Sequence, residues 1–239
     1  SLKITSNYDG IVSKDNLTIN EGTYEITTDD DGIRGKDSVL ITGGIFTINA
    51  GGDGIKSTND EDTLKGYINI TNGRFNITSV NDGIQAQTNL TIKEGTFTIN
   101  TNGDGIQAAS ELNITNGVYN IKTMNGYMSS GFNSDTTSCK GLKASGNDST
   151  TSTDNSTSTI NISGGTFNIN TIDDAVHSDG YINITGGTFD IYTGDDGVHA
   201  DTTLNLGTQN GYDRDPEINI YSSYEGLESG VVNIYSGKY

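Results

Sequence analysis

The motif Asp-Gly-Ile recurs along this chain at a fixed pitch. Full copies begin at Asp9, Asp31, Asp53, Asp82 and Asp104, and degenerate copies begin at Asp174, Asp196 and Glu225. Four steps between neighbouring copies are 22 residues long, and two steps of 29 residues equal one repeat of 22 plus seven. A fixed period with insertions between repeats is typical of solenoids, in which each repeat contacts only its neighbours.

Each repeat also carries short apolar pairs at alternate positions. Leu17 and Ile19 form one pair, Tyr24 and Ile26 form the next, and Gly22 lies between them. Alternation at period two predicts strands with one buried face, and a glycine between strands predicts a corner. Parallel crossovers are overwhelmingly right-handed. We therefore predict an all-β, right-handed parallel β-helix with about nine rungs of ~22 residues and three strands per rung.

We expect residues 1–239 to form a single β-helix domain. Leu2 falls at a second-strand position and Gly237 matches Gly22, so the chain starts and stops in mid-rung. This pattern predicts a fragment of a longer protein, because open solenoid ends usually need caps. Four insertions interrupt the repeat, near residues 58–66, 125–140, 146–158 and 207–217.

The acidic composition limits the partners. A formal net charge of −18 disfavours nucleic acid and anionic membranes, and fits hard cations or neutral partners. The single cysteine, Cys139, excludes an intrachain disulfide. No run approaches the roughly 18 apolar residues that span a bilayer, so membrane insertion is not expected. The polar, β-rich composition favours a secreted or cell-surface protein.

Stacking of the rungs would place the acidic residues of the motif in a column. Carboxylates ~4.8 Å apart repel by roughly 3 kcal/mol per pair at an effective dielectric of 20. Either backbone N–H groups at the corners bond each carboxylate, or a cation bridges them. Oxygen ligands without cysteine or histidine clusters fit Ca²⁺. The candidate calcium ligands are Asp9, Asp30, Asp31, Asp53, Asp173, Asp174, Asp195 and Asp196.

A second column is expected three residues after the first residue of each motif copy, on the outward side of the strand. A row of basic and amide side chains along one exposed strand face is typical of a groove that binds an extended polymer. The alternative is a solvated sheet face, whose outward residues are polar in any case. His177 and His199 stack directly, but they lack a third nitrogen or sulfur ligand for zinc. The candidate carbohydrate-binding residues in this outward row are Arg34, Lys56, Gln85, Gln107, Lys143, His177 and His199.

Tyrosines gather towards the C-terminal end of the chain and lie outside the buried aromatic series. They form either a patch that stacks on sugar rings or interior side chains exposed at an open end. These residues are Tyr192, Tyr212, Tyr221, Tyr224, Tyr235 and Tyr239.

The repeat Asp31-Gly32-Ile33-Arg34-Gly35-Lys36-Asp37, followed by Leu40-Ile41-Thr42-Gly43-Gly44, resembles bacterial, largely clostridial, secreted carbohydrate-binding proteins. That family is similar to the family-nine polysaccharide lyases, which are parallel β-helices with aspartate-bound Ca²⁺ and a lysine base. The resemblance implies an extracellular binder of plant cell-wall polysaccharides, namely cellulose and acidic pectic polymers such as polygalacturonate. At the outward positions beside Asp174 and Asp196 this chain has histidine, which departs from the lyase pattern.

Three functions remain open on the sequence alone. The leading hypothesis is a non-catalytic, calcium-containing carbohydrate-binding protein. The second is a calcium-dependent pectate lyase working by β-elimination, with Lys56 or Lys143 as the base. The third is a structural or adhesin stalk that calcium only rigidifies.

Overall fold

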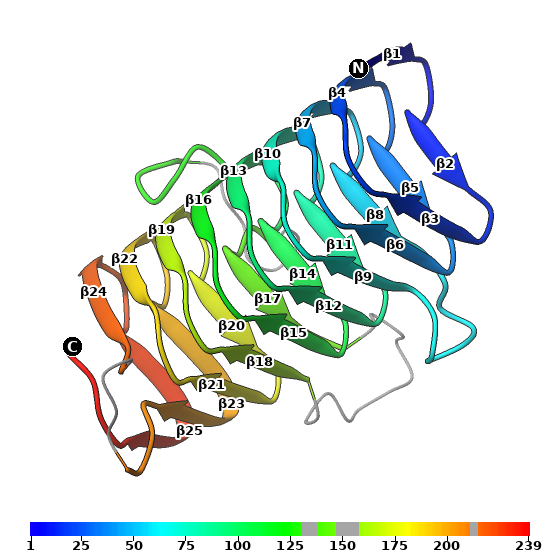
Figure 1. Ribbon diagram of the computed structural model, residues 1–239. Helices are drawn as coiled ribbons and strands as arrows, with labels where there is room; N and C mark the ends of the chain where they lie inside the picture. Colours follow the sequence, from blue (N-terminus) through cyan, green and yellow to red (C-terminus); the bar gives the residue numbers. More distant parts are fainter. Residues whose placement is uncertain (131–137, 147–157, 211–214) are drawn as a thin grey trace.

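The computed structural model describes residues 1–130, 138–146, 158–210 and 215–239. Within these ranges the chain forms strands and turns only, so they contain no helix that could cross a membrane. All strand pairs run parallel, and they form two long sheets (Figure 1). The predicted all-β, parallel architecture is confirmed, and the arrangement is consistent with a parallel β-solenoid.

The nine-stranded sheet takes one strand from each passage of the chain along the coil. Its neighbouring strands keep the repeat in register, so that Tyr24 lies beside Phe46 and Ile26 beside Ile48. The sheet consists, in order, of β1 (Leu2–Ser6), β4 (Thr23–Thr28), β7 (Ile45–Ala50), β10 (Arg74–Ser79), β13 (Thr96–Thr101), β16 (Val118–Thr123), β19 (Thr166–Thr171), β22 (Thr188–Thr193) and β24 (Glu217–Ser222).

The sixteen-stranded sheet covers the other sides of the coil and is folded on itself. One half consists of β2 (Ile11–Ser13), β5 (Ile33–Gly35), β8 (Ile55–Ser57), β11 (Ile84–Ala86), β14 (Ile106–Ala108), β17 (Leu142–Ala144), β20 (Val176–Ser178) and β23 (Val198–Leu206). The other half consists of β3 (Asn16–Ile19), β6 (Ser38–Ile41), β9 (Tyr67–Ile70), β12 (Asn89–Ile92), β15 (Glu111–Ile114), β18 (Thr159–Ile162) and β21 (Tyr181–Ile184), and β25 (Leu227–Ile234) pairs with β23.

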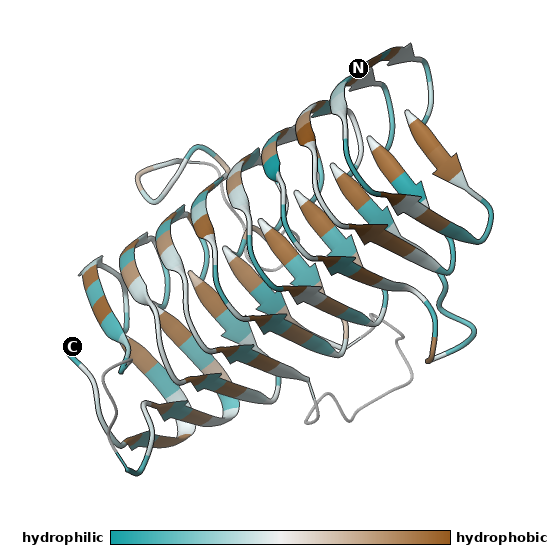
Figure 2. Cartoon of the chain, in the orientation of Figure 1, coloured by the Kyte–Doolittle hydropathy of each residue, from teal (hydrophilic) through white to brown (hydrophobic). Residues whose placement is uncertain are grey.

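The core lies inside the coil because alternate residues of each strand point inwards. Apolar and polar residues accordingly alternate along the strands (Figure 2). Seven aromatic rings form one interior column, with neighbouring ring centroids 4.4–4.9 Å apart and nearly parallel planes. This spacing equals the separation of hydrogen-bonded strands. The column contains Tyr24, Phe46, Phe75, Phe97, Tyr119, Phe167 and Phe189.

Two glycine positions show why the repeat needs glycine. Gly95 has a φ of +143°, and an added Cβ would lie 2.8 Å from Cε2 of Phe97, which agrees with the predicted corner. A Cβ on Gly83 of the Asp-Gly-Ile motif would lie 2.5 Å from the carbonyl oxygen of Gly105 and from Cγ2 of Ile99. The motif therefore keeps glycine where two passages of the chain approach too closely for a side chain.

The insertion near 58–66 is fixed by buried polar contacts. The Asn59 amide donates to Oδ1 of Asp37 at 2.6 Å, and its oxygen accepts backbone N–H groups of Glu61 and Asp62. Lys65 forms an ion pair with Asp37 at 3.0 Å. The insertions near 125–140, 146–158 and 207–217 lie partly outside the described residues.

Candidate functional site

The outward row lies on one continuous strip of the sixteen-stranded sheet. The register pairs Arg34 with Lys56, Lys143 with His177, and His177 with His199. Gln85 and Gln107 pair with each other and lie between the lysines. The structure thus brings the predicted residues together, whereas their role in binding stays a prediction.

Beside this strip, the aspartates of the motif form a hydrogen-bonded row that we call the aspartate ladder. Oδ1 of each ladder residue accepts a hydrogen bond from the backbone N–H of the equivalent residue on the next strand. Backbone donors of this kind stabilise a carboxylate without a metal. The acceptor and donor pairs are Asp9–Asp31 (3.2 Å), Asp31–Asp53 (2.9 Å), Asp53–Asp82 (2.8 Å), Asp82–Asp104 (2.7 Å), Asp104–Lys140 (2.7 Å), Asp174–Asp196 (3.1 Å) and Asp196–Glu225 (3.0 Å).

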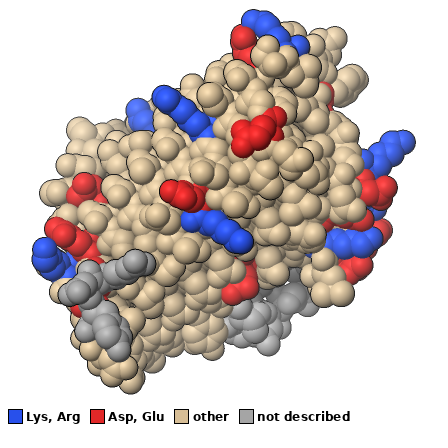
Figure 3. All heavy atoms as spheres, viewed as in Figure 1, with Lys and Arg blue, Asp and Glu red and all other residues tan. Residues whose placement is uncertain are grey.

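The outward row supplies cations to the second oxygens of the ladder. Arg34 lies 2.6 Å from Oδ2 of Asp9, Lys143 lies 3.0 Å from Oδ2 of Asp104, and Lys56 forms an ion pair with Asp53. These three pairs therefore neutralise part of the acidic charge of the ladder. On the face shown in Figure 3, Lys and Arg side chains lie beside Asp and Glu side chains in several places, and uncharged surface surrounds these groups.

Asp82 has an amide partner in place of a cation. In the orientation that gives its amide nitrogen acceptors, Gln107 donates to Oδ2 of Asp82 at 2.9 Å and to Oδ2 of Asp104 at 3.2 Å. Burial, together with the neighbouring charges of Asp104 and Asp53, raises the pKa of Asp82 well above its usual range. The middle of the ladder is thus its least compensated part.

The ladder changes near its C-terminal end, where Lys140 replaces aspartate. Its ammonium lies 2.7 Å from Oδ1 of Asp173 and 2.9 Å from Oδ2 of Asp174, and both carboxylates are almost fully buried. Although burial favours a neutral amine, the two aspartates raise the pKa of Lys140. A lysine therefore lies between the two aspartates, a contact that was not predicted from the sequence.

The two histidines of the outward row complete this cluster. Nδ1 of His177 lies 2.8 Å from Oδ2 of Asp174, and Nε2 lies 2.9 Å from Asp179. Although burial favours the neutral carboxyl, His177, His199 and Lys140 hold the pKa of Asp174 well below its usual range. The interaction with Asp174, opposed by partial burial, raises the pKa of His199 to about 9. Imidazolium ions and the Lys140 ammonium therefore occupy the surroundings of Asp174.

The raised pKa of His199 predicts that stability falls with rising pH. The contribution is fully present below the ordinary pKa of 6.5 and is lost as the pH rises through about 9. We expect wild type to lose about 1–3 kcal/mol of unfolding free energy more than His199→Gln between about pH 6 and pH 10. Urea unfolding of both proteins at the two pH values measures this difference, and equal losses would contradict the prediction.

The N-terminal end of the ladder carries a second acidic cluster that retains net negative charge. One oxygen from each of Asp9, Asp30 and Asp31 lies within 4.8 Å of the others. Asp31 is buried and Asp30 is exposed. Burial, with Asp53 and Asp30 adding to it, raises the pKa of Asp31. Arg34 is the one cation paired with these three carboxylates among the described residues.

A basic groove lies next to this cluster, over β2, β5 and β8. It has a volume of about 430 Å³, and its lining holds three of the thirteen Lys and Arg residues of the chain. Lys14 and Lys36 are exposed, and Lys36 pairs with the exposed Glu61 at 3.7 Å, whereas the lysines further along the strip pair with the buried Asp53 and Asp104. The outward row included Arg34 but not the two lysines. The groove is lined by Val12, Ser13, Lys14, Arg34, Lys36 and Thr58.

The predicted metal ligands fall into separate groups. Asp9, Asp30 and Asp31 come together at one end. At the other end, Asp173, Asp174 and Asp195 form one group, and Asp196 meets His199 and Glu228. Asp53 lies in the ladder between them and is paired with Lys56.

Three tyrosines form a contiguous stack on the nine-stranded sheet. The rings of Tyr192 and Tyr221 are 4.9 Å apart and nearly parallel, and the ring of Tyr127 lies 5.6 Å from Tyr192. Sequence reasoning included two of these and missed Tyr127, which comes from an insertion and has no place in the repeat. Tyr212 lies outside the described residues.

These features define a protein class: a parallel β-solenoid with a hydrogen-bonded aspartate ladder and polar outer faces. A family model described as "Carbohydrate-binding domain-containing protein" matches residues 1–104 and again residues 89–197, together most of the 239 residues. The chain therefore belongs to this family of carbohydrate-binding domain-containing proteins. Comparisons with curated proteins and with solved structures found no match.

Proposed function

We propose that this chain is a non-catalytic, calcium-containing module that binds plant cell-wall polysaccharides outside a bacterial cell. Cellulose and polygalacturonate are the proposed ligands, and a right-handed β-helix of about nine rungs, related to the family-nine lyases, is the proposed scaffold. Membership of a carbohydrate-binding family supports the ligand class. The observation that carries the proposal is the basic groove beside a negatively charged acidic cluster.

The basic groove suits an acidic polysaccharide. Lys14 and Lys36 are exposed, and Arg34 is partly exposed, so that the three can approach successive uronate carboxylates. Charge-assisted hydrogen bonds of this kind are stronger than neutral ones. The groove is open along the coil, as an extended chain requires, and its cations locally offset the net charge of −18.

The N-terminal acidic cluster fits calcium better than the C-terminal one. Asp9, Asp30 and Asp31 supply three carboxylates against one arginine, which leaves charge for a divalent cation. Calcium bound there would also supply charge for a uronate carboxylate near the basic groove. Around Asp174, an ammonium and two imidazoles already contact the carboxylates, so those residues fit the ion less well.

The state of the lysines favours binding over catalysis. A lysine that removes a proton must be neutral at its working pH. Lys56 and Lys143 are instead held in ion pairs with Asp53 and Asp104, which raise the pKa of each despite burial. These observations weigh against the pectate lyase alternative.

Polygalacturonate, with Ca²⁺ or with EDTA, tests the proposed function directly. We expect sedimentation of the protein with the polymer and no growth of the ultraviolet absorbance that unsaturated products show. Growing absorbance would establish the lyase, and Lys56→Met and Lys143→Met would then identify the base. If the protein bound neither polygalacturonate nor cellulose, the result would favour a structural or adhesin stalk.

Removing the groove cations is expected to weaken polygalacturonate binding. Because two carboxylate partners are lost, Lys14→Gln/Lys36→Gln should reduce the affinity about tenfold, or ~1.4 kcal/mol. The control is Lys93→Gln, which removes an exposed lysine after β12, away from the groove. Affinity electrophoresis in gels with polygalacturonate measures the change; an equal retardation of all three proteins would refute this site.

The calcium site has its own test. Calorimetric titration with Ca²⁺ should show one site fewer in Asp30→Asn than in wild type, because Asp30 is an exposed ligand whose replacement leaves the ladder intact. Asp195→Asn serves as the control at the other cluster. The same number of sites in Asp30→Asn and wild type would remove calcium from this position.

A further inference from the structure

The polar side chains on two sides of the coil are already bonded to one another. One side carries the aspartate ladder with its cations. On the other, side-chain amides form an asparagine ladder, in which each Nδ2 donates to Oδ1 of the preceding residue at 2.8–3.0 Å. Along this ladder, which runs from β15 to β25, little hydrogen-bonding capacity remains for a ligand, whereas Asn69 and Thr91 at the equivalent positions of β9 and β12 lie outside it. The asparagine ladder consists of Asn113, Asn161, Asn183, Asn205 and Asn233.

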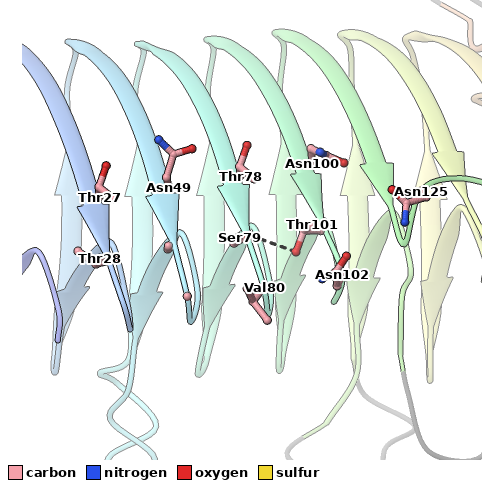
Figure 4. A pocket seen from close by; sticks show the side chains of 12 residues that line it. Thr27, Thr28, Asn49, Thr78, Ser79, Val80, Asn100, Thr101, Asn102 and Asn125 are labelled. Carbon is pink, nitrogen blue, oxygen red and sulfur yellow. Dashed lines mark hydrogen bonds between the residues drawn. The ribbon is translucent and has the colours of Figure 1, made fainter. Parts of the chain in front are cut away.

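The outer face of the nine-stranded sheet differs from both. Thr27, Asn49, Thr78 and Asn100 occupy equivalent outward positions on β4, β7, β10 and β13. All four are exposed, and within the described part of the chain their side chains make no hydrogen bond. Figure 4 shows them projecting on the same side of successive strands. This row therefore offers free hydroxyl and amide groups at the strand spacing of about 4.8 Å.

A groove of about 330 Å³ runs along this row at the ends of the strands. Its lining consists of threonine, asparagine, serine, glycine, alanine and valine, without any charged residue (Figure 4). Asn102 and Asn125 add further amides at its edge. A carboxylate placed there would lose water without gaining a counter-charge, whereas sugar hydroxyls can both donate and accept.

The same row leads to the tyrosine stack. Beyond Asn100 it continues through Lys122, its one cation, to Asn170 and Tyr192. The backbone N–H of Tyr127 donates to Oδ1 of Asn170 at 2.9 Å, which fixes the insertion beside the row. Tyr221 is 59% exposed. Rings that are apolar yet carry a hydroxyl can contact both the C–H groups and the hydroxyls of a sugar.

We infer that an unbranched, neutral polysaccharide binds along the outer face of the nine-stranded sheet, from the groove over Asn49, Thr78 and Asn100 to the tyrosine stack. The inference rests on the proposed carbohydrate-binding function and assigns the neutral ligand to a site separate from the basic groove. The amides and hydroxyls bond the sugar hydroxyls, and Tyr192 and Tyr221 contact the sugar rings. The uncharged lining of the groove selects against uronates, and Lys122 is the one cation on the row between the groove and the tyrosine stack.

Calorimetric titration with cellohexaose and with hexagalacturonate, on the full chain, tests this assignment. In Asn49→Ala/Asn100→Ala and in Tyr192→Ala/Tyr221→Ala, we expect the cellohexaose affinity to fall at least tenfold and the hexagalacturonate affinity to stay unchanged. The matched control Asn20→Ala/Asn116→Ala removes two exposed amides at the opposite strand ends and should bind both as wild type does. Unfolding midpoints of every variant verify the fold.

The outcomes separate this inference from the proposed function. Unchanged cellohexaose affinity in both double variants would overturn the groove, while carbohydrate binding itself would stand. Binding of hexagalacturonate without any binding of cellohexaose would overturn the neutral site in the same way. If wild type bound neither these oligosaccharides nor the parent polymers, the proposed function would fail and the groove with it.

Discussion

Replacing Lys140 by methionine is expected to lower the free energy of unfolding by about 3–5 kcal/mol, because it leaves the buried Asp173 carboxylate without its cation and removes one of the three basic partners of Asp174. The Lys140 ammonium lies 2.7 Å from Asp173 and 2.9 Å from Asp174, and each of these side chains is 3% exposed. Methionine keeps the length of the side chain and removes the charge. Urea unfolding at neutral pH measures the loss.

An exposed ion pair provides the control for Lys140→Met. Lys3 and Glu25 also bridge neighbouring strands, but both side chains are more than half exposed. Water screens such pairs, and Lys3→Met should therefore leave the unfolding midpoint nearly unchanged. The double variant Asp173→Asn/Asp174→Asn on the Lys140→Met background should restore part of the loss. Equal effects of Lys140→Met and Lys3→Met would show that the buried cluster is not held by charge.

Replacing Phe97 by alanine is expected to cost about 3–5 kcal/mol as well, through the lost apolar burial and the cavity that remains. Phe97 is fully buried between the rings of Phe75 and Tyr119, at centroid distances of 4.8 and 4.9 Å. The backbone hydrogen bonds between strands fix the ring spacing, so the column cannot collapse around the gap.

Val118→Ala controls for truncation of an apolar side chain on the same sheet. Val118 pairs with the residue before Phe97 in the strand register, but it points outwards and is 44% exposed. We expect its unfolding midpoint in urea to stay close to that of wild type. A loss for Phe97→Ala no larger than for Val118→Ala would mean that the aromatic column does not determine stability.

The repeat made the architecture predictable, because period-two alternation and glycine corners act locally. The alternation of Tyr24 and Ile26 predicts a strand with one buried face, and the structure places both side chains inwards. The register of Arg34 with Lys56, or of His177 with His199, follows from counting residues along the repeat. Tyr127 lies in an insertion and has no such count. Lys140 falls at a ladder position, but the contacts of its side chain with Asp173 and Asp174 could not be assigned from the sequence.

The repeat is enough to predict which side chains share a column, because a fixed pitch and parallel pairing allow a single alignment of the strands. The contacts that those side chains make are visible only in the folded structure. Oδ1 of Asp104 accepts the N–H of Lys140, its Oδ2 pairs with Lys143, and the asparagines of the opposite side bond one another. These outcomes depend on distances and directions across strands. In the described part of the chain, the amides of Asn49 and Asn100 on the outer face of the nine-stranded sheet make no such bonds. The alternation of polar residues in the sequence does not distinguish a bonded side chain from an unbonded one.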